Sequence, residues 1–454
     1  MGVSTIVSEP GAILDQPRQE DLDRCVHCGL CLNACPTYRE LGVEMDSPRG
    51  RIYQMVQVAT GRMEVSDSYQ EHIDLCLACR ACETACPSGV EYGKLVEAAR
   101  AHIELVKPRS LPVRLARRFV YGRLLVSPRL LKLAGNLVAF YQWSGLRRLL
   151  RASRVLRLFG NLDRLERLMP PAEKPFFFDQ IGRTFPARGE RRHRVAMVAG
   201  CLANVSFSRL NEATVRVLQQ NGCEVTLPAG QGCCGALHIH AGLRDLGRAL
   251  ARRNIDAFGV EHGSSLVQGV EHGSSLVQPG NYDAIITNAA GCGSTLKEYG
   301  ELVEHDPQYA ARARAFSSRV KDVNEFLASI SLNRDMRPLN ITVTYQDSCH
   351  LAHGQRIRLQ PRQLLEAIPG LKFKELPLSD LCCGSAGVYN VEHTDMSMSL
   401  LEKKMQMAST TGADTIVTAN PGCMLQLRAG AELFGRNQRV MHVVEVLDEA
   451  YRKQ

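Results

Sequence analysis

The sequence has no long apolar segment. No run of about 18 uncharged apolar residues occurs, and the most apolar stretch, residues 130–143, is short and contains Lys132. A helix that spans a bilayer needs about 20 predominantly apolar residues, so we expect no membrane-spanning helix. Residues 1–19 also lack the basic start and apolar run of a secretory signal peptide. We therefore expect a cytoplasmic protein.

Nucleotide-binding loops are absent as well. No G-x-G-x-x-G motif follows a predicted strand, and the sequence contains no G-x-x-x-x-G-K-[ST] motif. Such glycine-rich loops hold the phosphates of dinucleotides and nucleotides. We expect neither a flavin nor a nicotinamide in this chain.

Cysteine is abundant but unevenly distributed. The chain has 17 cysteines, of which eight lie in residues 25–86, none in residues 87–200 and nine in residues 201–423. Disulfides are rare in reducing compartments, where clustered thiols usually bind metal or perform redox chemistry. The distribution predicts separate metal-binding modules.

The first group of cysteines is one motif present twice. C-x2-C-x2-C-x3-C-P begins at Cys25 and again at Cys76. In such paired motifs the first three thiolates bind one [4Fe–4S] cluster, and the fourth binds the other cluster. The expected ligand sets are Cys25, Cys28, Cys31 and Cys86 for one cluster and Cys76, Cys79, Cys82 and Cys35 for the other. Structural zinc is the alternative, but zinc needs neither the third cysteine nor the trailing C-x3-C-P.

The remaining cysteines form a second repeat, with adjacent thiols followed by glycine. Each copy has four soft ligands, which are Cys201, Cys233, Cys234 and Cys292 in the first and Cys349, Cys382, Cys383 and Cys423 in the second. Adjacent side chains reach one metal centre only where the backbone turns sharply, which glycine permits. Sulfur-rich sites select iron–sulfur clusters, zinc or Cu(I). Cys223 is left over, and we expect it to be a buried apolar residue.

Between these cysteines the sequence alternates predicted strands and helices. Residues 195–198, 284–287, 341–345 and 415–418 are short apolar runs typical of a largely parallel sheet, and residues 208–221 and 394–409 are predicted helices. A cysteine follows each of the four runs. Sites in open α/β sheets lie at the carboxyl ends of strands, so we expect these thiols to meet there.

The expected fold is therefore α+β and multidomain. A helical two-cluster ferredoxin-like domain precedes a basic helical segment and a duplicated α/β Cys-Cys-Gly domain. The expected boundaries are a lead-in at 1–20, the ferredoxin-like domain at 21–100, the helical segment and linker at 101–192, and the Cys-Cys-Gly units at 193–330 and 338–454.

The basic character of the chain belongs to one segment. Residues 107–167 contain fifteen Lys or Arg and two acids, a local balance of +13 in a chain whose formal net charge is +8. Three interpretations remain open: a helix face packed on the chain or on a partner, contact with an anionic membrane surface, or nucleic-acid binding. The segment has no recognised nucleic-acid-binding fold, so we expect no nucleic-acid partner.

Two further features are open to a functional and an ordinary interpretation. Four histidines near the Cys-Cys-Gly motifs either contact a cluster or are ordinary core and surface residues: His238, His240, His350 and His353. The ten-residue sequence GVEHGSSLVQ occurs twice in succession, at 259–268 and 269–278. We interpret this duplication as an insertion in a surface loop without function.

Several stretches together resemble the iron–sulfur subunit of bacterial glycolate oxidase over nearly the whole chain. They are RCVHCGLCLNACPTY (24–38), SPRGRIYQM (47–55), CLACRACETACPSGV (76–90), GCCGA (232–236), NAAGCGSTLKEYG (288–300), LCCGSAG (381–387) and TANPGC (418–423). The C-terminal units are also similar to the Cys-Cys-Gly domains of heterodisulfide reductases and of the iron–sulfur subunit of anaerobic glycerol-3-phosphate dehydrogenase. In heterodisulfide reductases each unit ends in C-x2-C, whereas the first position of that pair is Ala289 or Asn420 here.

The resemblance implies an oxidoreductase subunit. Flavoprotein partner subunits would oxidise glycolate to glyoxylate, and this chain would carry the electrons toward a quinone through two [4Fe–4S] clusters. Further clusters at the Cys-Cys-Gly units and peripheral contact with the inner face of the cytoplasmic membrane are compatible with this role. The alternatives are a lactate or glycerol-3-phosphate dehydrogenase subunit, or a unit that reduces a disulfide as heterodisulfide reductases do.

Overall fold

The computed structural model describes residues 15–107, 109–153, 155–160, 162–259, 280–434 and 438–452. Most of the ten-residue duplication, residues 260–278, lies outside the described residues. No single helix among the described residues is long and apolar enough to cross a membrane. Residues 111–124 and 128–143 pass that test only as a pair, and the pair is bent by 107°.

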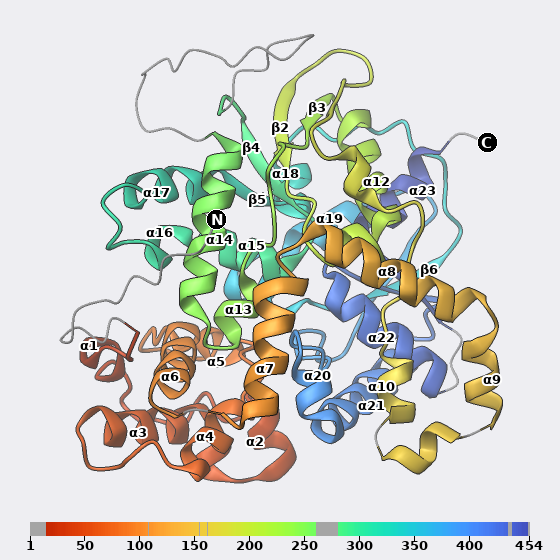
Figure 1. The fold of residues 1–454 in the computed structure, drawn as a ribbon. Coiled ribbons are helices and arrows are strands. Elements are labelled where there is room, and N and C mark those ends of the chain that lie inside the picture. Colours follow the sequence, from red (N-terminus) through yellow and green to blue (C-terminus); the bar gives the residue numbers. More distant parts are fainter. Residues whose placement is uncertain are drawn as a thin grey trace.

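Helices alone build the N-terminal part, which Figure 1 shows as a separate group at one end of the molecule. They are α1 (Gln19–Leu22), α2 (Pro36–Leu41), the 3-10 turn η1 (Glu44–Asp46), α3 (Pro48–Ala59), α4 (Asp67–Asp74), α5 (Ala81–Thr84) and α6 (Tyr92–Val106). Ser47 and Ser66 cap α3 and α4 by accepting hydrogen bonds from backbone N–H groups of the first turn. The helices enclose a core that includes Ile52, Tyr69 and Leu95.

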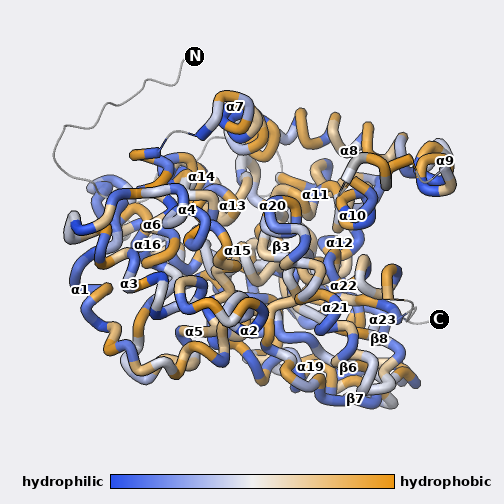
Figure 2. The backbone as a smooth tube through the Cα atoms, turned by 90° about the horizontal axis from the view of Figure 1, so that it is seen from below, coloured by the Kyte–Doolittle hydropathy of each residue, from blue (hydrophilic) through white to orange (hydrophobic). Residues whose placement is uncertain are grey.

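The basic segment is helical, as predicted. Its elements are α7 (Leu111–Phe119), a π-helical turn η2 (Val120–Leu124), α8 (Pro128–Trp143), α9 (Leu146–Ser153), the 3-10 turn η3 (Val155–Phe159) and α10 (Leu162–Arg167). Helix α8 begins with Ser127 as its cap and Pro128 at the first helical position. Figure 2 shows α7, α8 and α9 along one edge of the molecule, with hydrophobic and hydrophilic positions alternating along α8.

Helix α8 is apolar on two faces. Leu131, Gly135 and Ala139 recur every four residues and are buried. The opposite face consists of exposed side chains at helical spacing: Leu133, Leu137, Phe140 and Trp143. Burial of the first stripe explains why the helix packs against the rest of the protein. The second stripe is exposed, although the Lys174 ammonium lies over the Trp143 ring at 5.6 Å from its centroid.

The first Cys-Cys-Gly unit is built on a five-stranded sheet in the order β1-β3-β2-β4-β5. Its strands are β1 (Thr184–Phe185), β2 (His193–Met197), β3 (Cys223–Thr226), β4 (Ala284–Thr287) and β5 (Val320–Asp322). Only β1 is antiparallel to its neighbour. The other elements of residues 177–329 are η4 (Phe177–Gln180), α11 (Ala203–Ser206), α12 (Ser208–Gln220), α13 (Ala236–His240), α14 (Arg244–Phe258), α15 (Ala290–Lys297), α16 (Tyr299–Leu302), α17 (Ala310–Arg319) and α18 (Val323–Ser329).

The second unit is built on a four-stranded parallel sheet in the order β7-β6-β8-β9. Its strands are β6 (Thr342–Tyr345), β7 (Lys372–Glu375), β8 (Thr415–Thr418) and β9 (Arg439–His442). The other elements are the π-helical turn η5 (His350–Gly354), α19 (Leu359–Glu366), α20 (Tyr389–Glu392), α21 (Thr394–Thr410), α22 (Pro421–Leu433) and α23 (Val443–Tyr451).

The two units have the same topology, which confirms the predicted duplication. The order β3-β2-β4-β5 matches β7-β6-β8-β9, and all eight of these strands are parallel. Even the caps correspond, because Asp322 and His442 each form a capping box at the start of the last helix of their unit. The four apolar runs predicted as strands are β2, β4, β6 and β8, and the predicted helices are α12 and α21.

Both sheets contribute to a single hydrophobic core. Val195 and Ile286 of the first sheet belong to the same buried cluster as Val343 and Ile416 of the second. A bidentate ion pair joins the units near this core: the Arg216 guanidinium donates to both carboxylate oxygens of Asp448, at 2.9 and 2.8 Å. The two units therefore pack as one body.

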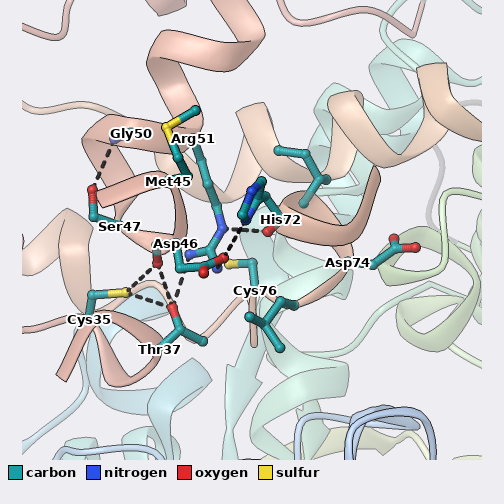
Figure 3. A network of polar contacts seen from close by, with 12 residues as sticks. Cys35, Thr37, Met45, Asp46, Ser47, Gly50, Arg51, His72, Asp74 and Cys76 are labelled. Carbon is teal, nitrogen blue, oxygen red and sulfur yellow. Dashed lines mark hydrogen bonds and ion pairs between the residues drawn. The ribbon is translucent and has the colours of Figure 1, made fainter. Parts of the chain in front are cut away.

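A buried arginine holds the helical N-terminal part together. Arg51 is fully buried, and its guanidinium donates to the backbone oxygen of His72 at 2.6 Å, to Thr37 Oγ1 at 3.1 Å and to Asp46 at 3.3 Å. Figure 3 shows this network, with Cys35 and Cys76 on either side of it. The guanidinium thus satisfies the buried carboxylate of Asp46 while joining α3 to α2 and α4.

We predict that Arg51→Met strongly destabilises the N-terminal part. Removing one member of a buried ion pair leaves the other charge unpaired, which costs about 3–5 kcal/mol. The measurement is the urea dependence of the far-ultraviolet circular dichroism and of visible cluster absorbance in anaerobically purified protein. Arg62→Met is the control because Arg62 is exposed. Equal unfolding midpoints for the two variants would contradict the prediction.

Candidate metal centres

The two cysteine motifs of the N-terminal part have the same local backbone. His27 and Gly29 flank Cys28 with φ of 53° and 82°, and Ala78 and Arg80 flank Cys79 with φ of 50° and 63°. A non-glycine residue in the left-handed region costs of order 1–3 kcal/mol and persists only where the surroundings enforce it. The two cluster loops therefore share the same left-handed turns.

The fourth cysteine of each motif lies with the thiols of the other motif. Cys86 is close enough to Cys25 for its charge to raise the pKa of that thiol. Cys35 has the same effect on the pKa of Cys79 and of Cys82. Cys35 also raises the pKa of Cys31 in its own motif, so the thiols of the two motifs lie close to one another and the division into two ligand sets stays a prediction.

The two groups differ in exposure. Cys28 is exposed and Cys25, Cys31 and Cys86 are partly exposed, whereas Cys35, Cys76, Cys79 and Cys82 are all buried. Burial raises the pKa of the Cys79 and Cys82 thiols well above the ordinary value. A bound metal ion compensates this cost, since a coordinating thiol is deprotonated outright.

The glycine after each adjacent cysteine pair has the expected left-handed backbone. Gly235 has φ of 88° and Gly384 has φ of 87°. A Cβ atom at Gly384 would lie 2.5 Å from the backbone oxygen of Ser397, so no side chain fits there. These turns let both adjacent thiols face the same side.

In each unit the four thiols form a chain of contacts. In the first unit Cys201 contacts Cys233, Cys233 contacts Cys234, and the Cys234 and Cys292 sulfurs lie 3.1 Å apart. In the second unit the equivalent chain runs through Cys349, Cys382, Cys383 and Cys423. Thiol contacts and burial together raise the pKa of Cys201 and of Cys423 well above the ordinary value. Four soft ligands at one place fit an iron–sulfur cluster.

All eight of these thiols line one cavity of about 550 Å³ between the two units. The cavity also touches the N-terminal part at Cys76 and the basic segment at Arg117 and Leu168. The carboxyl ends of β2, β4, β6 and β8 therefore converge on one shared space, as expected for parallel sheets.

Two positions in the cavity wall correspond to the additional cysteine of heterodisulfide reductases, which this chain lacks. Ala289 and Asn420 are the N-caps of α15 and α22. The Asn420 amide donates a hydrogen bond to the Cys423 sulfur at 3.5 Å. In the second unit an amide donor thus stands where heterodisulfide reductases have a ligand.

The N-terminal part touches the second unit through cysteines. Cys79 and Cys382 belong to one buried hydrophobic cluster that also contains Tyr389, with Cys349 packed against it. The charge of Cys382 raises the pKa of Cys79. The buried group of thiols is thus adjacent to the second Cys-Cys-Gly unit.

Of the four candidate histidines, His350 contacts a cysteine sulfur, with 3.5 Å between its Nδ1 atom and Cys349 Sγ. His238 bonds the backbone oxygen of Tyr121 at 2.9 Å, and His240 pairs with Glu97 at 2.9 Å. His353 lies 2.9 Å from the Thr84 hydroxyl and 3.1 Å from the Asp380 backbone oxygen. The leftover Cys223 is buried in strand β3, and burial raises the pKa of its thiol to about 12.

Some residues at these sites escape sequence analysis. The Tyr92 hydroxyl donates to the Cys76 sulfur at 3.7 Å, and Arg80 pairs with both Glu83 and Glu298. Tyr92 follows a turn and Arg80 lies inside a cysteine motif. The only sequence signal for a role of either residue is therefore its short separation along the chain from the cysteines. The ion pair of Arg80 with Glu298 joins a cluster loop to the first unit.

Family models match the chain in three parts. A 4Fe-4S dicluster domain matches residues 21–90, and a cysteine-rich domain matches residues 195–297 and 343–428. The linker region of the glycolate oxidase iron–sulfur subunit matches residues 112–169. The chain is therefore an iron–sulfur protein with two [4Fe–4S] clusters in its N-terminal part.

Relatives of known name cover nearly the full length. The probable glycolate oxidase iron–sulfur subunit of Bacillus subtilis is 41% identical over 95% of this chain and 94% of its own. The glycolate oxidase iron–sulfur subunit of Escherichia coli is 34% identical over 95% of each. Lactate utilization protein A of Bacillus cytotoxicus is 29% identical over 56% of this chain and 98% of its own. The chain belongs to the family of glycolate oxidase iron–sulfur subunits.

Proposed function

We propose that this chain carries electrons from flavoprotein subunits that oxidise glycolate to glyoxylate toward a membrane quinone. The proposed cluster ligands are Cys25, Cys28, Cys31 and Cys86 for the first cluster and Cys76, Cys79, Cys82 and Cys35 for the second. The observation that supports this route is a continuous series of thiol groups from exposed Cys28 to the cavity. Cys79 and Cys382 form its junction.

The entry point of this route is the exposed cluster loop. The first cysteine motif and the helices that follow it carry apolar side chains exposed to between 36% and 67%, namely Val26, Leu30, Leu41, Val43, Met45 and Tyr53. A contiguous exposed apolar patch typically marks a protein interface. A flavoprotein subunit that covers this patch would bring its flavin near the first cluster.

The basic segment supports contact with an anionic membrane surface. Leu111, Leu115 and Phe119 are exposed at four-residue steps on α7, and α8 adds the exposed stripe described above. The exposed cations beside them, Arg114, Arg118 and Arg129, have no acidic partner among the described residues. Apolar and unpaired basic side chains on one face suit the interface of a bilayer with anionic lipids.

Lactate is the alternative substrate with support from a relative, because lactate utilization protein A is similar over 56% of the chain. The substrate binds on another subunit in either case. Turnover of glycolate, lactate and glycerol 3-phosphate by the complex purified with its partners separates these substrates. We expect glycolate to be oxidised fastest.

The first prediction of this proposal concerns crossed ligation. Anaerobically purified protein should contain about eight iron and eight sulfide for the N-terminal clusters alone. Cys35→Ala should change the same electron paramagnetic resonance signal as Cys79→Ala, and Cys86→Ala the same signal as Cys28→Ala. Cys223→Ala is the control and should leave both signals intact. If Cys35→Ala instead changed the signal that Cys28→Ala changes, the ligand assignment would be wrong. Stoichiometric zinc without iron would show that the chain holds no iron–sulfur clusters.

A second prediction concerns the entry face. Val43→Arg places a charge in the exposed apolar patch, and we expect it to slow reduction of the clusters by glycolate about tenfold in the assembled complex. Cluster absorbance after a glycolate pulse in a stopped-flow instrument gives the rate. Leu359→Arg, on an exposed part of α19, should have no effect. An unchanged rate in Val43→Arg would place the flavoprotein elsewhere.

A third prediction concerns the membrane face. The chain should float with vesicles that contain phosphatidylglycerol, and salt should weaken binding because the attraction is partly electrostatic. Leu137→Ser with Phe140→Ser removes two apolar side chains from the exposed face of α8 and should weaken binding about tenfold or more. Tyr53→Ser is the control, since Tyr53 lies on the N-terminal part. If the double variant instead loses its flavoprotein partners, the face is a subunit interface.

A further inference from the structure

The cavity between the Cys-Cys-Gly units extends beyond the thiols. Its volume of about 550 Å³ lies in the range of small-molecule sites. The cysteines form part of its wall, and α6, α7 and the end of α10 contribute Arg100, Arg117 and Met169. The cavity therefore extends from the thiols to α6, α7 and the end of α10.

Much of the wall besides the thiols is apolar. It contains Leu165, Leu168 and Met169 from the α10 region, together with Leu202, Leu237 and Leu425 of the two units. Leu165 lies in α10, and Leu168 and Met169 follow the end of that helix. Three arginines also line the cavity, but Arg109 and Arg117 pair with Glu104, and Arg100 donates to backbone oxygens. With these cations already paired, the apolar wall favours a hydrophobic ligand.

One polar atom in the wall has no partner. The Nε2 atom of His350 is buried and has no hydrogen-bond partner among the described residues, and the residue lines the cavity. A buried nitrogen without a partner is costly. Imidazole nitrogen bonds a quinone carbonyl as a donor or a hydroquinone hydroxyl as an acceptor, depending on its tautomer.

The cavity also lies next to the face that we assign to the membrane. Arg117 of α7 lines the cavity, whereas Leu115 and Phe119 of the same helix are exposed. One side of α7 therefore faces the thiols and the other faces outward. A lipid-soluble ligand would therefore have to pass only helix α7 to reach the cavity from the membrane face.

We propose that this cavity is the quinone-reduction site, an inference that rests on the function proposed above. The quinone ring would lie against the apolar residues of the α10 region, beside the eight Cys-Cys-Gly thiols that would hold iron–sulfur clusters. Such clusters would supply one-electron transfer, with both electrons originating in the reduced flavin of the partner subunit. With two protons from solvent, these electrons convert the quinone to its hydroquinone.

The test fills the cavity without touching a thiol. Leu165→Trp and Met169→Trp, made separately, place an indole in the apolar wall, and Leu162→Trp is the matched control because Leu162 is exposed on the same helix. The probe is 2-heptyl-4-hydroxyquinoline N-oxide, whose fluorescence is quenched on binding, titrated into the anaerobic complex in detergent. We expect one site per chain, weakened at least tenfold by Leu165→Trp or Met169→Trp and unchanged by Leu162→Trp.

Cluster reduction by glycolate, followed in the same samples, separates the two proposals. If the clusters are reduced and the probe binds Leu165→Trp and Met169→Trp as tightly as the unaltered complex, the cavity is not the quinone site. If glycolate reduces no cluster in the unaltered complex, the proposed function itself fails. Binding of a disulfide such as oxidised glutathione, with its reduction and without binding of the probe, would overturn the quinone in favour of a disulfide ligand.

Discussion

Burial of thiols is the constraint on which the rest of this structure depends. A ligand thiolate carries charge, yet most of the cysteines at the candidate sites lie where desolvation raises the thiol pKa. Iron resolves this conflict because it stabilises the thiolate and because clusters of four thiols share one metal centre. The fold therefore has to bring distant cysteines together before it gains that stabilisation. The left-handed turns in the cluster loops and at Gly235 and Gly384 serve this purpose.

The same constraint explains how the parts of the chain are joined. Burial opposes the charge of Arg51, but Cys76 and Cys35 on either side of it, together with Asp46, raise the pKa of its guanidinium above the ordinary value. At the other boundary, Cys79 and Cys382 pack in one apolar cluster. Short separations between redox centres require such packing, because each interface that brings cysteines together must also exclude water.

Much of this architecture was predictable because it is local. Cysteine spacing defined the two groups of the N-terminal part, and four apolar runs gave the central strands of both sheets. The shared cavity was only partly predictable: parallel strands place thiols at one edge, but no sequence pattern indicates that two units face each other. The partners of Arg51 and the approach of Leu165 and Met169 to the thiols depend on tertiary packing. Side chains at the expected ligand positions could be named in advance, whereas those that surround them could not.

The single hydrophobic core shared by the two sheets has a mechanical consequence. Domains in one chain usually move relative to each other unless their interface is large and hydrophobic. Here Val195 and Val343 belong to one buried cluster, so the two halves do not open like a hinge. The short helix α10, which contributes Leu165 to the wall of the space between them, is joined to the second unit by the exposed ion pairs Arg164–Asp395 and Arg167–Glu432. Ionic strength would weaken these exposed pairs while leaving the shared apolar core intact.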